Sequence, residues 1–199
     1  MNAVDRPGLQ RTSEATGGLE REVRLQAIDW QVIVKRHGPI VWRTAYRLLG
    51  NHADAADCFQ ETFVCALQLC QRQPVRNFAA LLARLATARA IDQLRHRLRQ
   101  AHTRADLNDR VAVPSGNPDP SQHLQTQELA ARLRWAMAQL PEQEAQAFCL
   151  RYLNGMSYRL IAKQLGIKAN AAGVSLHRAR AKLRELLAKS PCDKESEVQ

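Results

Sequence analysis

The sequence predicts an all-α protein made of two helical domains that a flexible linker joins, and three observations predict it. No stretch alternates apolar and polar residues in the way that a half-buried strand does. Apolar residues instead recur every three or four positions along most of the chain, as they do on one face of a helix. Between two such regions lies ADLNDRVAVPSGNPDPSQ, whose prolines, glycine and short polar residues are typical of a linker.

The changes in composition divide the chain into five segments. We expect a disordered leader over 1–22, a first domain over 23–100, the linker over 101–122, a second domain over 123–189 and a polar tail over 190–199. The leader lacks the apolar stretch of a signal peptide. Arginines interrupt every apolar run, so we expect no membrane span and a cytoplasmic protein.

The first domain is predicted to contain four helices. A helix over 23–36 should end at the His-Gly-Pro stretch 37–39, because proline has no amide hydrogen to donate inside a helix. The same proline can stand in the first turn of a second helix over 40–49. A third helix should follow and end near residue 70, and a fourth should cover 78–99.

The second domain is predicted to contain four more helices. The first covers 123–139, and Pro141 opens the next, which the Asn-Gly pair at 154–155 should end. Ser157 can cap a short third helix, because its hydroxyl can accept a hydrogen bond from a free backbone N–H. The last helix covers 169–188.

The last two of these helices have the layout of a helix-turn-helix. Gly166 stands at the turn, where a left-handed backbone costs glycine least. Apolar residues then recur at helical spacing on the side expected to face inward: Ala172, Leu176, Ala179, Leu183 and Leu187. The second helix of such a motif lies in the DNA major groove. A plain helical hairpin with a solvated basic face is the alternative.

The charge of the chain favours a polyanionic partner. Lys and Arg number 29 against 19 Asp and Glu, a net charge of +10, and this favours nucleic acid or an anionic membrane. The fourth predicted helix carries a basic strip with Arg84, Arg95, Arg97 and Arg99.

The last predicted helix divides into a small-sided half and a basic half. The first half offers few side chains for base edges, chiefly Lys168, Asn170 and Ser175. The second half suits phosphates, which position a protein without reading sequence. Its candidate residues are His177, Arg178, Arg180 and Lys182.

One face of the third predicted helix is acidic. Asp54, Asp57 and Glu61 are spaced three and four residues apart and share this face, with Gln60 beside them. No histidine or metal-ligand cluster accompanies the carboxylates, so the pattern predicts neither catalysis nor an enzyme. An acidic face in so basic a chain instead indicates docking on a basic protein surface.

The five cysteines form no Cys-x-x-Cys pair. Cys58 and Cys65 stand seven residues apart, where two helical residues share a face, and are interpreted as buried apolar thiols. We therefore expect no structural metal site, no disulfide framework and no cofactor. This use of cysteine suits a reducing cytoplasm.

Four stretches of the chain resemble bacterial sigma-70 family factors of the extracytoplasmic-function (ECF) group. They read RHGPIVWRTAYRLLGNHADAADCFQETFVCAL, FAALLARLATARAIDQLRHRLR, LPEQEAQAFCLRYLNGMSYRLIAKQLGI and LHRARAKLREL. The resemblance implies a sigma region 2-like helical bundle in the first domain and a region 4-like helix-turn-helix in the second. It also implies a non-enzymatic factor that binds core RNA polymerase and directs promoter recognition, DNA melting and transcription initiation.

The resemblance also implies partners for the candidate residues. Asp57, Gln60 and Glu61 match positions that would dock on the clamp of the largest polymerase subunit, and the flap is a second expected contact. The loop that ends at Asn77 and the helix through Arg95 would hold the minus-ten promoter element. The helix-turn-helix would contact the minus-thirty-five element. An anti-sigma factor is a further candidate partner.

Two alternatives to this function stay open at the level of sequence. A helix-turn-helix regulator could act without polymerase, although it would not need the acidic face. A degenerate sigma-like protein could serve only as an interaction module. Departures from the family pattern at Leu81, Thr87, Ala88 and Leu160 motivate this second alternative.

Overall fold

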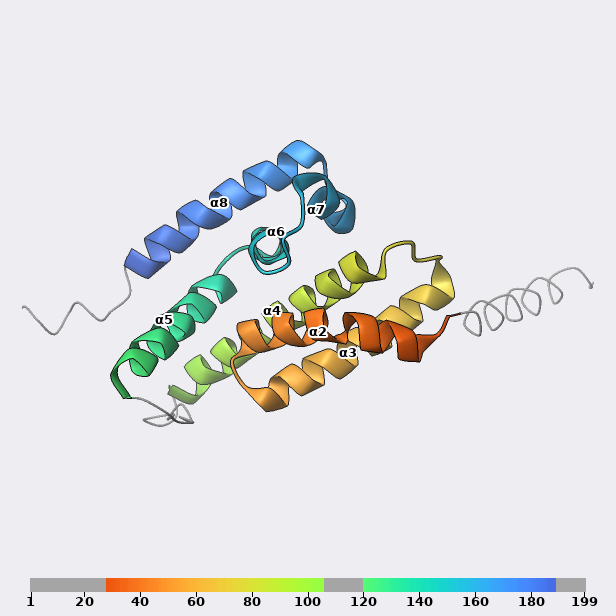
Figure 1. The fold of residues 1–199 in the computed structure, drawn as a ribbon. Helices are drawn as coiled ribbons and strands as arrows, with labels where there is room; N and C mark the ends of the chain where they lie inside the picture. Colours follow the sequence, from red (N-terminus) through yellow and green to blue (C-terminus); the bar gives the residue numbers. More distant parts are fainter. Residues whose placement is uncertain (1–27, 106–119, 189–199) are drawn as a thin grey trace, which may run out of the picture.

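The computed structural model describes residues 28–105 and 120–188, and this part of the chain is helical without a strand. Its helices are α2 (Trp30–Leu49), α3 (His52–Arg72), α4 (Phe78–Ala105), α5 (Pro120–Ala138), α6 (Glu142–Tyr152), α7 (Tyr158–Leu165) and α8 (Ala169–Ala188). Helices α2, α3 and α4 form one group, and α5 to α8 lie along one side of it (Figure 1). The prediction of an all-α fold is confirmed.

Helix α2 passes through Pro39 without a break, so the prediction of two helices divided there is wrong. A proline inside a helix costs roughly 3 kcal/mol, because it removes a backbone hydrogen bond. Packing of the residues that follow the proline offsets this cost, because Val41 is fully buried in a cluster with residues of α3 and α4 and Ile40 packs against the same cluster. The helix begins after Asp29, whose side chain accepts a backbone hydrogen bond from the first turn. Residues 23–27 of the predicted helix lie outside the described residues.

Asparagine caps fix the starts of the next two helices. The Asn51 side chain accepts a hydrogen bond from the N–H of Asp54 at 2.9 Å, which opens α3. Asn77 does the same for α4 by accepting from the N–H of Ala80 at 2.9 Å. Each cap satisfies one of the amide groups that a helix start leaves unpaired.

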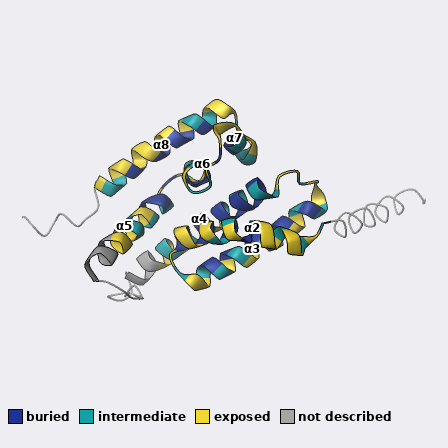
Figure 2. Cartoon of the chain, in the orientation of Figure 1, coloured by how far each residue is buried: buried dark blue, intermediate teal, exposed yellow. Residues whose placement is uncertain are grey.

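The predicted helix-turn-helix is present in α7 and α8. Ser157 caps α7, and Gly166 ends it with a left-handed backbone at φ 67°. The predicted inward stripe of α8 is confirmed, since Ala172, Leu176, Ala179 and Leu183 are buried and Leu187 packs against the cluster that contains Ala179 and Leu183. Figure 2 shows how buried and exposed residues alternate around the helices.

The two helix groups share one hydrophobic core. Leu49 and Ile91 from the first group pack in one cluster with Met137, Leu140 and Leu183 from the second. Helix α4 contacts α5, α6 and α7. The described domains are therefore packed against each other.

The helices also extend into the segment expected to be a linker. Helix α4 continues to Ala105 and α5 begins at Pro120, so both take residues from the predicted linker over 101–122. The remaining residues of that segment, 106–119, and the whole of the predicted leader and tail lie outside the described residues.

The described cysteines are free thiols, and three of the four are buried. Burial raises the pKa of Cys149 to about 12 and that of Cys58 to about 11, because a thiolate is poorly solvated in the core. Cys65 is only partly buried, and a guanidinium nitrogen of Arg89 lies 2.9 Å from its sulfur. The interpretation of Cys58 as a buried thiol is confirmed, and Cys65 is more accessible than predicted.

Candidate nucleic-acid and protein interfaces

Helix α3 presents a continuous exposed surface, here called the α3 face. Its residues are Asp57, Gln60, Glu61, Val64 and Leu67. Spacings of three and four residues place them on one side of the helix. The structure thus brings together three of the four residues predicted for protein docking, and leaves them exposed.

Two apolar members of the α3 face were missed at the level of sequence. Val64 is 53% exposed and Leu67 is 36% exposed. Their spacing from Gln60, four and then three residues, was the available signal. They add an apolar edge to the acidic surface, which is the composition of a protein-binding surface with a charged rim.

Asp54 does not belong to the α3 face. Its carboxylate accepts a 2.6 Å hydrogen bond from the side chain of Asn51 and forms an ion pair with Arg97 of α4. Both partners hold the carboxylate at the start of α3, where a negative charge also interacts favourably with the helix dipole. These contacts indicate that Asp54 stabilises the start of α3 and its packing on α4.

Two of the predicted DNA-binding arginines of α4 donate hydrogen bonds to backbone carbonyls, and those of Arg95 cross to the second helix group. Arg95 donates hydrogen bonds to the carbonyl oxygens of Ala138 and Leu140, at 3.4 and 2.7 Å. Arg97 donates to the carbonyl oxygen of Leu49 at 3.5 Å. These carbonyls stand at or just beyond the ends of α5 and α2, where backbone oxygens lack partners within the helix. Arg95 is thus partly buried against the second helix group and does not stand on the predicted exposed strip, whereas the side chain of Arg97 remains 39% exposed.

Arg84 and Asn77 lie beside a cavity of about 420 Å³ between the two helix groups. The loop before α4 supplies Asn77, α4 supplies Arg84 and α7 supplies Lys163. Burial lowers the pKa of Arg84. Arg99, farther along α4, is exposed. The residues of the predicted basic strip therefore lie in different places: Arg84 lines the cavity, Arg95 lies between the helix groups and Arg99 is exposed.

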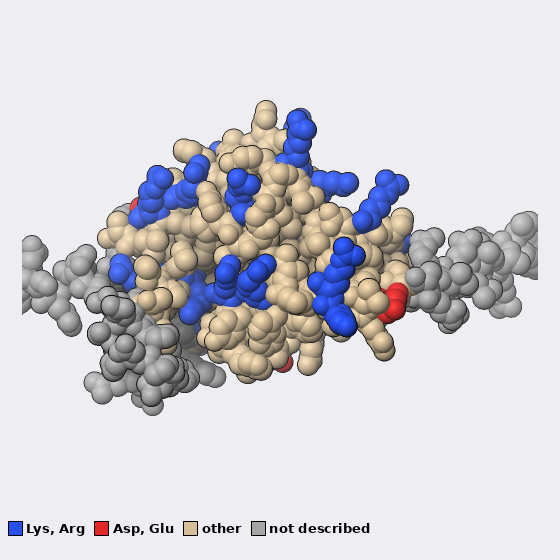
Figure 3. Space-filling model, in the orientation of Figure 1, with Lys and Arg blue, Asp and Glu red and all other residues tan. Residues whose placement is uncertain are grey.

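Most of the residues predicted for DNA contact on α8 are exposed. They are Lys168, just before the helix, and Asn170, His177, Arg178, Arg180 and Lys182. Lys182 also forms an ion pair with Glu185 at 3.1 Å. In Figure 3, Lys and Arg are spread over both helix groups of the visible face, where Asp and Glu are few. This surface can neutralise a polyanion.

Ser175 is not on this surface, so its assignment to base contact is corrected. It is 5% exposed, and its hydroxyl accepts a 2.8 Å hydrogen bond from the side-chain amide of Gln143. The residue lies beside Leu176 on the buried side of α8, which a count of polar side chains alone does not distinguish from the exposed side.

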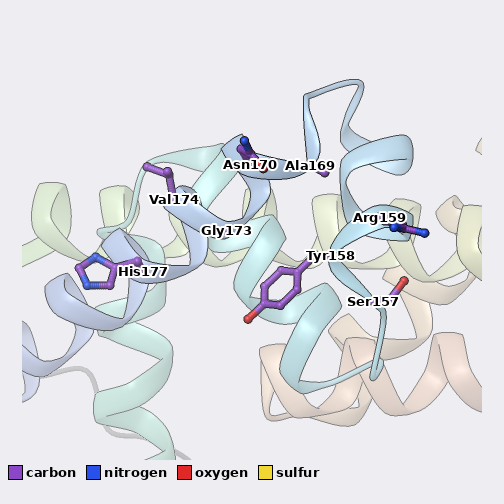
Figure 4. A pocket seen from close by; sticks show the side chains of 8 residues that line it. All are labelled: Ser157, Tyr158, Arg159, Ala169, Asn170, Gly173, Val174 and His177. Atoms are coloured by element: carbon purple, nitrogen blue, oxygen red, sulfur yellow. The ribbon is translucent and has the colours of Figure 1, made fainter.

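An open groove of about 730 Å³ lies between the start of α7 and the first half of α8. Tyr158 projects from α7, and Asn170, Val174 and His177 project from α8 (Figure 4). Gly173 contributes no side chain to it. The guanidinium of Arg151 lies 5.3 Å from the centre of the Tyr158 ring, a cation–π contact.

The described residues hold neither a membrane helix nor a metal cluster. None of the described helices is long and apolar enough to cross a bilayer. Over the same residues, no group of three or more His, Cys, Asp or Glu side chains is placed to hold a metal ion.

Two family models match the chain in the order of its two helix groups. Sigma-70 region 2 matches residues 33–100, which cover α2, α3 and most of α4. Sigma-70, region 4 matches residues 130–183, which extend from α5 into α8.

Curated relatives are sigma factors. The chain is 36% identical over 161 residues to ECF RNA polymerase sigma factor SigE of Mycolicibacterium smegmatis, which covers 81% of the chain and 62% of that protein. It is 33% identical over 153 residues to RNA polymerase sigma factor CarQ of Myxococcus xanthus, which covers 76% of the chain and 85% of that protein. The chain thus spans somewhat less than two thirds of the first relative and most of the second.

Solved structures share the fold. The sigma factor CnrH, solved with the cytosolic domain of CnrY, matches with a TM-score of 0.56 at 24% identity over 85% of this chain and 96% of that one. The sigma factor RpoE, solved with the anti-sigma factor NepR from Bartonella quintana, matches with a TM-score of 0.51 at 23% identity over 81% and 98%. The order of the helices, the two matched regions and the identity to CarQ agree, and the chain belongs to the sigma-70 family of RNA polymerase sigma factors, in its ECF group.

Proposed function

We propose that this chain binds core RNA polymerase through the α3 face and directs it to promoter DNA through the loop before α4 and the exposed surface of α8. Membership of the sigma-70 family supports a transcription initiation factor, with no catalytic step of its own. The observation that carries the residue assignment is the exposure of Asp57, Gln60 and Glu61 on one side of α3.

The chemistry of the α3 face supports polymerase docking. Two carboxylates beside two exposed apolar side chains fit a partner surface that is basic at its rim and apolar at its centre. The carboxylates also lie in a chain of net charge +10, so they mark this surface as different from the rest. Asp54 is left out of the proposed contact because Asn51 and Arg97 already engage it.

Two DNA contacts follow from the positions of the basic residues. The cavity beside Asn77 and Arg84 is proposed for the minus-ten element. The exposed residues of α8 are proposed for the minus-thirty-five element, with Lys168 and Asn170 near base edges and Arg178 and Arg180 on phosphates. Arg95 and Arg97 can join the first contact only after they leave their carbonyl partners.

The partners of related proteins suggest one further contact. The two solved structures above were determined with NepR, named an anti-sigma factor, and with a domain of CnrY. We propose that an anti-sigma factor also binds this chain. A role on core RNA polymerase places the protein in the bacterial cytoplasm.

Binding to purified core RNA polymerase tests the docking assignment. The variant Asp57→Arg/Glu61→Arg reverses both charges of the α3 face and should lower affinity for core polymerase at least tenfold. Asp92→Arg/Glu185→Arg is the matched control, because it makes the same charge change at two exposed residues of other helices. Equal binding by the two variants would refute the assignment.

Run-off transcription on genomic DNA fragments then tests the function itself. Specific starts that depend on the chain are expected. Tight binding to core polymerase without any specific start would instead favour the interaction module considered from the sequence.

A further inference from the structure

The groove between α7 and α8 is apolar at its centre and basic at its edges. Tyr158, 47% exposed, and Val174, 49% exposed, are the large apolar side chains that line the groove, and none of the described residues that line it carries a carboxylate. Arg159 and His177 line it as well, and Arg178 follows on the exposed side of α8. An apolar surface between the guanidinium groups of Arg159 and Arg178 fits a polyanion that carries an apolar group.

Gly173 lies in the same groove, and packing within the chain does not explain it. Apart from its own helix and chain neighbours, no described residue has an atom within 4 Å of a Cβ added at this position. A glycine inside a helix costs about 1 kcal/mol relative to alanine. The missing side chain gives a ligand closer access to the backbone of α8 and to the ring of Tyr158 (Figure 4).

The position along the helix identifies the part of DNA that would reach this groove. The N-terminal residues of the second helix in a helix-turn-helix lie near base edges in the major groove. Asn170, Gly173 and Val174 are in the first two turns of α8. The only apolar group that base edges present in the major groove is the C5-methyl group of thymine.

We propose that Val174 is a specificity-determining residue that packs against a thymine methyl group in the minus-thirty-five element, with Tyr158 and Gly173 shaping the groove. This inference rests on the proposed function, because it requires that α8 contacts promoter DNA. It adds to that function a preference for thymine at one position, read by apolar contact and without a hydrogen bond.

Replacement of thymine by deoxyuridine removes only the methyl group, so it tests the contact directly. The full chain with core polymerase first selects promoters from DNA randomised over the minus-thirty-five element. Each thymine of the selected element is then replaced singly by deoxyuridine, and the affinity of the holoenzyme is measured. One replacement should weaken binding about fourfold, the size expected for loss of one buried methyl group.

Variants of the protein test whether Val174 causes the loss of affinity on deoxyuridine replacement. In Val174→Ala the same replacement should change affinity by less than about 1.5-fold. Val32→Ala is the matched control, since Val32 is a similarly exposed valine, at 55%, on α2; it should keep the full fourfold effect. Gly173→Ala should weaken promoter binding and raise the thermal stability of the chain, which separates its effect from unfolding.

The outcomes separate this inference from the proposed function. Failure to select any promoter sequence would refute the proposed function and this inference with it. Selection of an element in which no thymine is sensitive to loss of its methyl group would refute the inference alone. A sensitivity that persists unchanged in Val174→Ala would assign the contact to another residue and would also refute it. If the groove instead receives an anti-sigma factor, Val174→Ala should weaken that complex and leave the deoxyuridine effect unchanged.

Discussion

The guanidinium of Arg95 on α4 lies 2.7 Å from the carbonyl oxygen of Leu140, just beyond the end of α5. The same side chain also donates to Ala138. One residue of the first helix group therefore binds two backbone oxygens of the second, close to the core that both groups share.

Replacement of Arg95 by methionine should weaken the packing of the two helix groups. Hydrogen bonds from a charged donor contribute about 1.5–3 kcal/mol, and the two carbonyls would lose this donor. We expect Arg95→Met to lower the free energy of unfolding by an amount in this range and to increase the radius of gyration in X-ray scattering. Arg180→Met, at an exposed position of α8, should change neither quantity. An unchanged radius of gyration and stability in Arg95→Met would contradict the role of this contact.

Replacement of Thr87 by valine should stabilise the protein. Thr87 is fully buried, and its hydroxyl has no hydrogen-bond partner among the described residues. A buried hydroxyl without a partner costs about 1–3 kcal/mol, so its removal should raise the free energy of unfolding by about 1 kcal/mol. Urea denaturation measures this difference.

Thr62 provides the matched control for that substitution. It is equally buried, but its hydroxyl donates a 2.7 Å hydrogen bond to the carbonyl oxygen of Cys58. Thr62→Val should therefore lower the free energy of unfolding by about 1 kcal/mol. Changes of the same sign in both variants would show that the hydrogen bond does not decide the effect.

The raised pKa of Cys149 predicts a loss of stability in alkaline solution. Burial raises the pKa of this thiol in the folded chain to about 12, from an ordinary value of 9.0. Above pH 9 the unfolded chain binds fewer protons than the folded one, so stability is retained below pH 9 and lost between pH 9 and 12. The loss should approach roughly 1.4 kcal/mol per pH unit within this range.

The comparison with Cys149→Ala isolates this contribution. The variant should be less stable at pH 8, because it leaves a small cavity, and its stability should fall less steeply from pH 9 to 10.5. Iodoacetamide provides a second measurement: Cys149 should react only after unfolding, whereas the partly buried Cys65 should react in the native protein. Native labelling of Cys149 at the same rate as Cys65 would contradict the prediction.

The helices that carry strong local signals could be predicted from the sequence. Ser157 and Gly166 set the bounds of α7 through a side-chain cap and a left-handed turn, which depend on neighbouring residues only. Pro39 was misjudged because its cost is local, whereas the burial that offsets it depends on α3 and α4. A local signal predicts an element correctly when tertiary packing does not oppose it.

The same distinction between local signals and tertiary packing explains which candidate site residues could be predicted. Asp57 and Glu61 could be placed on one surface because helical spacing alone decides it. Arg95 and Asp54 could not be placed, since their partners are distant in the sequence or depend on how the two helix groups pack. Ser175 was misassigned because the choice rested on its polar side chain, although its spacing from Ala172 and Ala179 places it on the inward side of α8, where Gln143 of α6 binds its hydroxyl.

The bonds of Arg95 to two backbone carbonyls have a consequence for the response to salt. A guanidinium bound to a neutral oxygen involves one charge, so dissolved ions weaken it little. Binding to phosphates releases counterions and therefore weakens steeply as the salt concentration rises. The ionic strength of the surroundings should thus shift the balance between the compact chain and the promoter-bound chain, with concentrated salt favouring the compact one.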